Sequence, residues 1–178
     1  TYRELDARVR GLAGALRARG VEPGDRVAML GQNSLEFVVA LHAIPRAGAI
    51  CVPLNVRLTS EELAFQLRDA GVRLLLTDEA HEERGRTAAE PGGVGEVAVL
   101  PIDGAPHETP VDIHHGGDVH SIVYTSGTTG SPKGAMLTFG NLWASATASA
   151  FNLGVLPGDR WLACMPLFNV GGLSIVIR

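Results

Sequence analysis

The chain has 178 residues, 46% of them hydrophobic, and a formal net charge of −4 at pH 7. That composition predicts a globular chain with one core of ordinary size and argues against a disordered tail. No window concentrates lysine and arginine, and no apolar run approaches the roughly 20 residues of a membrane-spanning helix. We therefore expect no nucleic-acid partner, no membrane span and a cytoplasmic location, while the oligomeric state stays open.

Capping boxes predict three helix starts. In a capping box, a short polar side chain and a glutamate three residues later satisfy each other's backbone N–H groups. The pairs with this spacing are Thr1 and Glu4, Asn33 and Glu36, and Thr59 and Glu62. A glycine ends the apolar pattern that follows each pair. The predicted helices cover residues 2–19, 33–48 and 59–71.

Short apolar runs separate these helices. They lie at residues 26–30, 49–54, 74–76 and 97–100. Because they are continuously apolar and do not alternate with polar residues, they are typical of strands in a parallel sheet that is buried on both faces. The alternation of strands with helices therefore predicts the α/β class, a parallel-sheet sandwich with helices on both faces.

The second half of the chain leads into two loops. Residues 103–118 form a connector rich in proline, glycine and histidine, which separates residues 1–102 from 119–178. A strand at 121–124 then enters a glycine-rich run, and an extended piece at 135–138 leaves it. A helix at 141–153 and a strand at 161–165 follow, and this last strand delivers residues 166–172 as a second loop.

The sequence context of the cysteines and tryptophans predicts structural roles for these residues. Cys51 and Cys164 each stand alone in an apolar, strand-like run, which is typical of a buried thiol. Trp143 and Trp161 lie on apolar elements near the loops, and aromatic residues in that setting usually belong to the core. We do not include these four residues in the candidate site.

A group of histidines in the connector could suggest a metal site. His114, His115, Asp118 and His120 lie close together in the sequence. The pattern lacks a second group of ligands at the spacing of a zinc site, and it falls in a segment without periodicity. We expect a solvated loop here.

Lys133 is the only lysine of the chain, beside fourteen arginines. It follows a run of hydroxyl and glycine residues, and a compact ammonium suits a point contact to phosphate. Glycines at 127, 130 and 134 let backbone N–H groups converge on an anion. The hydroxyls of Ser126, Thr128 and Thr129 can donate to phosphate or ligate magnesium. The run predicts a triphosphate cradle.

This cradle differs from a Walker A loop. There, Gly-Lys-Ser/Thr would open a helix, whereas Pro132 precedes Lys133 here and disfavours helix entry. The alternative is a solvated turn of serine, threonine and glycine without a ligand. A strand that feeds the loop and a proline that stiffens it favour the cradle.

The run Tyr124-Thr125-Ser126-Gly127-Thr128-Thr129-Gly130-Ser131-Pro132-Lys133-Gly134 resembles the signature of the adenylate-forming enzymes, the group of acyl-CoA synthetases, luciferases and peptide-synthetase adenylation domains. Blocks at residues 23–28, 33–36, 47–49, 52–55 and 63–71 are similar to the amino-terminal region of that family. The resemblance implies that residues 1–178 are a partial amino-terminal AMP-binding domain. Residues 119–178 would then hold the phosphate loop and the start of the acyl-pocket region.

The resemblance implies chemistry in two steps. A carboxylate attacks the α-phosphate of ATP to give an acyl-adenylate and pyrophosphate, and CoA then displaces AMP to form a thioester. ATP, Mg²⁺ and CoA are the implied cofactors and co-substrates, and a small carboxylic acid is the implied substrate. The implied cofactor-binding residues are Thr125, Ser126, Gly127, Thr128, Thr129, Gly130, Lys133 and Gly134.

Individual roles follow from the same resemblance. Lys133 would clamp the departing pyrophosphate; it would not act as a base, because neighbouring negative charge keeps an ammonium protonated. Thr128 and Thr129 would hold magnesium through their hydroxyls.

Residues 141–146, 152–154 and 161–175 are similar to the 2-succinylbenzoate–CoA ligases of menaquinone biosynthesis. The implied substrate-binding residues are Phe168, Asn169, Gly171 and Gly172. That group usually has a histidine where this chain has Asn169, whose amide can hydrogen-bond but does not titrate.

Other functions stay open. The chain could belong to a ligase for another aryl or fatty acid, to an adenylation domain that loads a carrier thiol, or to a non-catalytic remnant. The resemblance places the adenine and ribose motifs, the magnesium-binding acidic residue and a catalytic lysine beyond Arg178. We therefore expect no complete catalytic set in the chain and no adenylation by it alone.

Overall fold

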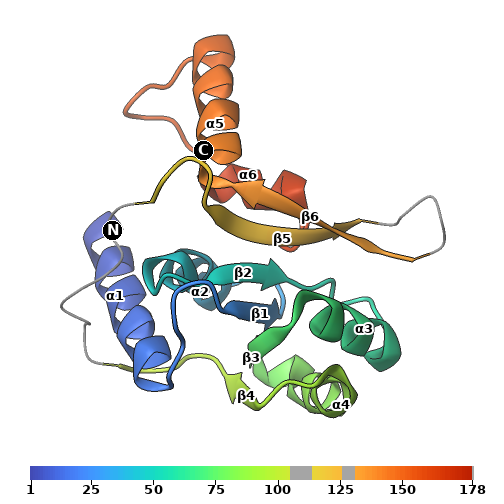
Figure 1. The fold of residues 1–178 in the computed structure, drawn as a ribbon. Coiled ribbons are helices and arrows are strands. Elements are labelled where there is room, and N and C mark those ends of the chain that lie inside the picture. Colours follow the sequence, from blue (N-terminus) through green and yellow to red (C-terminus); the bar gives the residue numbers. More distant parts are fainter. Residues whose placement is uncertain (105–113, 126–130, 178) are drawn as a thin grey trace.

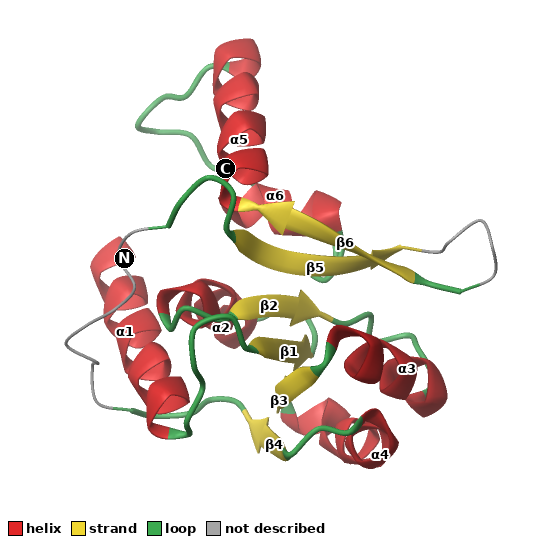
Figure 2. Cartoon of the chain, viewed as in Figure 1, coloured by secondary structure: helices red, strands yellow, loops and turns green. Residues whose placement is uncertain are grey.

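The computed structural model describes residues 1–104, 114–125 and 131–177. Helices and strands alternate along this part of the chain (Figures 1 and 2). The first elements are α1 (Tyr2–Ala18), β1 (Arg26–Leu30), α2 (Leu35–Arg46), β2 (Ile50–Pro53), α3 (Ser60–Ala70) and β3 (Val72–Thr77). They are followed by η1 (Glu79–His81), α4 (Glu82–Gly92), β4 (Glu96–Val99), β5 (Val119–Thr125), β6 (Lys133–Thr138), α5 (Phe139–Leu153) and α6 (Val170–Ile177).

The strands form one sheet in the order β4-β3-β1-β2-β5-β6. The neighbours from β4 to β5 are parallel, which confirms the α/β class, and β6 is antiparallel to β5. The direction of β6 follows from its connection: a parallel return needs a crossover of a dozen residues or more, and only residues 126–132 link the two strands. The sheet is therefore mixed at this edge.

Both faces of the sheet are apolar. In β1, Val27 and Met29 pack into the core beneath α1 and α2, whereas Ala28 and Leu30 pack into the core beneath α3 and α4. Figure 1 shows the two helix pairs on either side of the strands. Successive side chains of a strand point to opposite faces, so a strand between two helix layers is apolar at every position, as the sequence predicts.

Two of the three predicted capping boxes are confirmed. Thr1 caps α1 and Thr59 caps α3, each with the expected glutamate. The prediction that Asn33 and Glu36 form the third is wrong. Ser34 caps α2 by accepting a hydrogen bond of 3.0 Å from the Phe37 N–H, and the Glu36 carboxylate pairs with Arg8 at 2.9 Å. The Asn33 side chain is consequently available for other contacts.

The strand predicted at residues 161–165 is also wrong. The segment is irregular, and the Leu162 side chain is 81% exposed. Composition alone does not make a strand, because a strand needs a neighbour to pair with its backbone N–H and C=O groups. The sheet of the described residues ends at β6 and offers none here.

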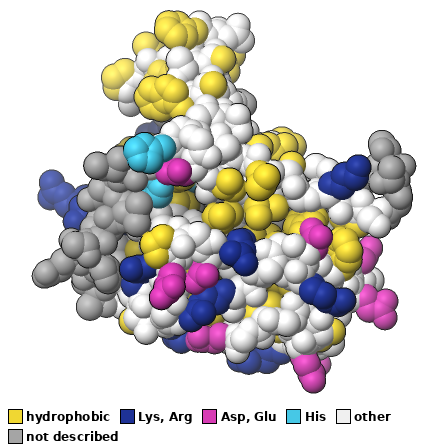
Figure 3. Space-filling model, viewed as in Figure 1, with side chains coloured by type: hydrophobic (Ala, Val, Ile, Leu, Met, Phe, Trp, Pro, Cys, Tyr) yellow, Lys and Arg dark blue, Asp and Glu magenta, His cyan; other side chains and the backbone are white. Residues whose placement is uncertain are grey.

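Burial corrects three further predictions. Cys51 is buried, as expected, and burial raises the pKa of its thiol, but Cys164 is exposed. Trp143 and Trp161 are 76% and 55% exposed and do not belong to the core. Trp143 lies on α5, which has no buried residue and projects from the sheet in Figure 1. In the same view, hydrophobic side chains gather on this projection (Figure 3).

The predicted solvated loop around the histidines is only partly correct. His114 stacks on the Phe139 ring with centroids 4.0 Å apart, and His120, buried in β5, meets the same ring edge-on. The Asp118 carboxylate accepts a hydrogen bond from the His115 backbone N–H. Within the described ranges, no three metal-binding side chains come together, and no helix is long and apolar enough to cross a membrane.

The burial of His120 predicts a pH-dependent stability. Desolvation, with smaller contributions from His42 and His114, lowers the His120 pKa to about 4. Because an unfolded histidine titrates near 6.5, the unfolded chain takes up this proton first as the pH falls. The free energy of unfolding should therefore drop, by on the order of 3 kcal/mol from this group, between pH 6.5 and about 4.

Urea unfolding at a series of pH values checks this expectation. His120→Leu should flatten the dependence in that window, whereas His115→Leu, at an exposed position, should change it less. Equal slopes in the wild type and His120→Leu would contradict the assignment.

Candidate functional site

The glycine-rich loop joins β5 to β6. Its two ends are paired in the sheet, with Tyr124 opposite Gly134 and Thr125 opposite Lys133. The Thr125 hydroxyl donates a hydrogen bond of 3.5 Å to the Lys133 carbonyl oxygen. This pairing places the ammonium-bearing residue beside the last residue of β5, at the mouth of the loop.

Five residues of the predicted phosphate loop lie outside the described residues. They are Ser126, Gly127, Thr128, Thr129 and Gly130. Lys133 is exposed, and no hydrogen bond or ion pair joins its side chain to another described residue. Thr125 is exposed as well. A hydroxyl at the start of the loop and a cation at its end are thus exposed to solvent.

Tyr124 anchors the strand that enters the loop. Its hydroxyl donates to the Asp69 carboxylate at 2.6 Å, and the Gln66 carbonyl oxygen lies 3.2 Å away. Burial, followed by the contact with Asp69, raises the Tyr124 pKa, so the phenol stays protonated as a donor. Both acceptors belong to α3, which ties the end of β5 to the helix layer. No pattern in the sequence indicates this pairing of residues 55 positions apart.

Gly134 has a packing role of its own. A Cβ atom at this position would lie 2.7 Å from Cγ2 of Ile122 and 3.3 Å from the Tyr124 ring. A glycine lets β6 run against these side chains without displacing them. The packing around the tyrosine anchor therefore accounts for this glycine without any ligand.

The second predicted loop passes through the core at Leu167 and Phe168 and reaches the surface at Asn169. Leu167 and Phe168 are buried in the cluster beneath α1 and α2, so the Phe168 ring packs against protein. Asn169 is exposed at the start of α6, where its carbonyl oxygen accepts from the Leu173 N–H at 2.9 Å. Of the predicted acyl-loop residues, Asn169 is the one whose side chain meets solvent beside the buried turn.

Gly171 and Gly172 differ sharply in the space around them. A Cβ on Gly172 would lie 2.2 Å from the Pro166 carbonyl oxygen and 2.8 Å from that of Met165, whereas one on Gly171 would meet only the end of the Met165 side chain, at 3.2 Å. The first turn of α6 thus packs directly on the backbone of the loop, and Gly172 is what permits that approach.

Asn33 joins the two halves of the chain. Its amide group hydrogen-bonds to the backbone of the segment that enters the second loop, at Met165 and Leu167. Sequence reasoning assigned Asn33 to a helix cap and missed this role. Ser34, at the next position, is an equally good cap. It was the one sequence signal that Asn33 need not cap the helix.

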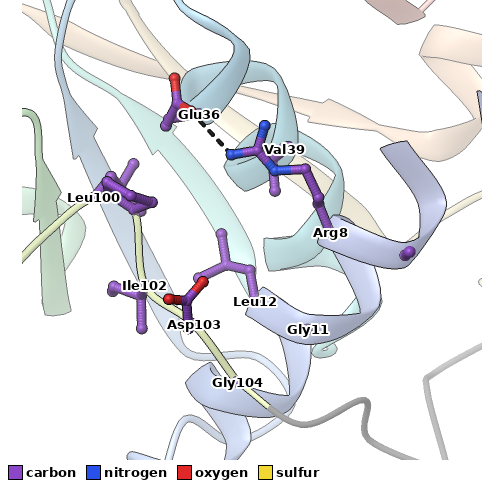
Figure 4. Close-up of a pocket in the computed structure, with 11 residues that line it drawn as sticks. Arg8, Gly11, Leu12, Glu36, Val39, Leu100, Ile102, Asp103 and Gly104 are labelled. Carbon is purple, nitrogen blue, oxygen red and sulfur yellow. Dashed lines mark hydrogen bonds and ion pairs between the residues drawn. The ribbon is translucent and has the colours of Figure 1, made fainter. Parts of the chain in front are cut away.

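Described residues also line cavities away from the glycine-rich loop. One of about 280 Å³ lies between α1, α2 and residues 100–104, where the Arg8–Glu36 ion pair borders it (Figure 4). A second, of about 390 Å³, lies at the carboxyl ends of β1 and β3. A third, of about 750 Å³, lies between α5, residues 154–163 and α6. Only this last cavity adjoins the segment that enters the second loop.

Fold and loop together define an α/β chain with a hydroxyl- and glycine-rich hairpin loop that ends in a single lysine. The AMP-binding enzyme family matches residues 1–177, and the chain belongs to that family. A curated relative, 2-succinylbenzoate–CoA ligase of Bacillus cereus, is 41% identical over the whole chain. The chain spans 36% of the length of that relative.

Solved structures of o-succinylbenzoate coenzyme A synthetase from Bacillus subtilis share the fold. The structure of the complex with ATP and magnesium ion is 36% identical in sequence and has a TM-score of 0.89. The match covers 99% of this chain and 47% of the chain in that structure. The complex with the acyl-adenylate intermediate OSB-AMP is 38% identical with a TM-score of 0.87, and covers 99% and 46%. At this sequence identity, the likeness supports a shared family as well as a shared fold.

The neighbouring glycines of α6 provide a matched test of the loop packing. Gly172→Ala should destabilise the protein by about 3 kcal/mol, because backbone atoms of Met165 and Pro166 cannot yield to the new methyl group. Gly171→Ala should be neutral, because the end of the Met165 side chain can move and alanine favours a helix. Thermal unfolding of the two variants measures the difference, and equal stabilities would contradict the packing described.

Proposed function

We propose that this chain supplies the phosphate-holding part of an ATP-dependent carboxylate–CoA ligase. The observation that carries the proposal is the β5–β6 hairpin, which sets Lys133 beside Thr125 at the mouth of a loop rich in hydroxyl groups. The relatives named for 2-succinylbenzoate and CoA, and the related structure with ATP and magnesium, support it. CoA is the proposed thiol co-substrate.

The residues present suit a polyphosphate bound with magnesium. Hydroxyl oxygens are hard ligands for this cation and donors to phosphate, and the exposed ammonium of Lys133 can approach phosphate oxygens as a point charge. Thr125, Ser126, Gly127, Thr128, Thr129, Gly130, Lys133 and Gly134 are the proposed phosphate-loop residues, with Thr128 and Thr129 as the magnesium ligands. When bound, magnesium would neutralise charge on the phosphate oxygens.

Lys133 acts on charge that grows during the proposed reaction. A substrate carboxylate oxygen attacks the α-phosphorus of ATP, the bond to the bridging oxygen breaks, and pyrophosphate departs with the extra negative charge. The CoA thiolate then attacks the acyl carbon and AMP leaves. A fixed ammonium at the pyrophosphate end stabilises the departing group more than the ground state, which raises the rate of the first step.

The proposed acid is 2-succinylbenzoate, and the proposed substrate-binding residues are Phe168, Asn169, Gly171 and Gly172. Phe168, being buried, would shape the loop from beneath, while the exposed Asn169 amide can hydrogen-bond a carboxylate. Because an amide carries no charge at any ordinary pH, recognition at this position is neutral. A ligase for another aryl or fatty acid shares every feature except the acid itself.

Lys133→Ala tests the clamp in the full-length protein. Carboxylate-dependent exchange of labelled pyrophosphate into ATP should fall about a hundredfold, the usual scale for removing one fixed donor to developing negative charge. Lys133→Arg should retain part of the rate, because the charge remains while its geometry changes. A panel of acids that includes 2-succinylbenzoate identifies the substrate in the same assay.

The control for this test is Arg86→Ala, which removes one positive charge from α4, where Arg86 pairs with Glu82 on the surface. Its exchange rate should match the wild type. If the Lys133→Ala enzyme is as active as Arg86→Ala, the proposed role of Lys133 as a pyrophosphate clamp is wrong. If the wild-type protein shows no exchange with any acid, the alternative that the chain belongs to a non-catalytic remnant is favoured.

The 178-residue chain alone should not catalyse this exchange. The family resemblance places the adenine and ribose motifs and the catalytic lysine that orients the carboxylate outside the chain, and a phosphate loop by itself binds without orienting the attack. Purified chain and full-length protein are compared at equal concentration with labelled pyrophosphate. Exchange by the chain above the no-enzyme rate would contradict this expectation.

A further inference from the structure

Asn33 lies where the fold changes direction. The chain adds β2 on one side of β1 and then crosses to add β3 on the other side, so the residues after β1 sit at the switch point of the sheet. Crevices outside the carboxyl ends of strands at such points are the usual ligand sites of α/β sheets. Asn33 follows β1 there, immediately before the Ser34 cap of α2.

The amide of Asn33 holds a distant backbone segment from two sides. Its Nδ2 donates to the Met165 carbonyl oxygen at 2.9 Å and lies 3.4 Å from that of Ala163, and its Oδ1 accepts from the Leu167 N–H at 2.9 Å. The partners fix the orientation of the amide, because a flipped group would set its NH₂ against an N–H and its oxygen against two carbonyl oxygens.

The segment held in this way has few other constraints. Residues 159–165 are irregular and exposed, and burial begins only at Leu167 and Phe168. Beyond them, the Asn169 N–H donates to the Pro166 carbonyl oxygen at 3.1 Å, which closes the turn that leads into α6. Asn33 therefore fixes the chain where it passes from solvent into the core, a few residues before Asn169.

Local structure does not require the Asn33 side chain. Ser34 caps α2 through the Phe37 N–H, so the helix start is satisfied without Asn33. Among the described residues, the hydrogen-bond partners of the Asn33 amide all lie 130 or more residues away in the sequence. The side chain thus serves the position of the second loop and not the fold of its own element.

We propose that Asn33 is a positioning residue for carboxylate binding. It sets the Met165–Leu167 backbone so that the following turn presents Asn169 at a fixed place beside α6. This inference rests on the proposed function, in which Asn169 and its neighbours line the acyl pocket. Asn33 itself touches neither phosphate nor the reacting carboxylate, so its loss should weaken binding of the acid and leave binding of ATP unchanged.

Three variants of the full-length protein separate the possibilities. Asn33→Ala removes both hydrogen-bonding groups. Asn33→Asp keeps the shape of the side chain and the oxygen that accepts from the Leu167 N–H. It replaces the amide nitrogen by a second oxygen, and this oxygen and the Met165 carbonyl oxygen repel each other. Ser34→Ala removes the neighbouring helix cap and leaves the Asn33 contacts in place, so it is the matched control for lost stability.

Pyrophosphate exchange with 2-succinylbenzoate at saturating ATP gives the first measurement. In Asn33→Ala and Asn33→Asp, the KM for the acid should rise about tenfold, while the KM for ATP stays at the wild-type value. Ser34→Ala should change neither KM. An unchanged KM for the acid in both Asn33 variants, or an equal rise in Ser34→Ala, would overturn the inference.

Hydrogen exchange at the Leu167 amide provides a second measurement that does not depend on activity. Exchange should be faster in Asn33→Ala, and close to the wild type in Asn33→Asp and Ser34→Ala, because only the first variant loses the acceptor. If the wild-type protein uses no acid, the proposed function fails while this measurement still tests the contact. Unaltered exchange in Asn33→Ala would show that the contact does not hold the loop, and would overturn the inference.

Discussion

The docking of β5 between β2 and β6 is the constraint on which the candidate site depends. On one side β5 joins the parallel sheet through β2, and on the other it pairs along its length with β6. Ile122 and Tyr124 pack toward the α3 and α4 layer, and the hydrogen bond from Tyr124 to Asp69 fixes the end of the strand. The pairing of β5 with β6 therefore sets the positions of Thr125 and Lys133, the described residues on either side of the glycine-rich run.

The features that could be predicted from the sequence are those encoded locally. The caps at Thr1 and Thr59 lie three residues from their partners, and continuously apolar strands indicate burial on both faces wherever the strands pair. The cap at residue 33 failed because Asn33 and Ser34 are both good caps, and only the long-range partners of Asn33 decide between them. The direction of β6 was not predicted, although the short link to β5 already excluded a parallel return.

In the candidate site, too, some features are predicted by the sequence and others are shown only by the structure. A motif identifies the phosphate loop from residue types alone, and the structure adds that Lys133 lies opposite Thr125. The contacts that hold the site, from Tyr124 to Asp69 and from Asn33 to Met165, join residues 55 and 132 positions apart. Hydrogen bonds of this kind leave no periodic trace in the sequence, because a single amide or phenol forms them without any pattern around it.

The apolar residues of α5 and of the segment after it are exposed in the structure. Trp143 was predicted to belong to the core, yet it is 76% exposed, and Phe151 on the same helix is 88% exposed. An apolar surface of this kind is stabilised when another surface removes it from water, and monomeric proteins seldom leave such patches uncovered. Apolar composition alone therefore predicts neither burial nor a strand here, because the segment at 161–165 has no strand beside it among the described residues to pair with its backbone.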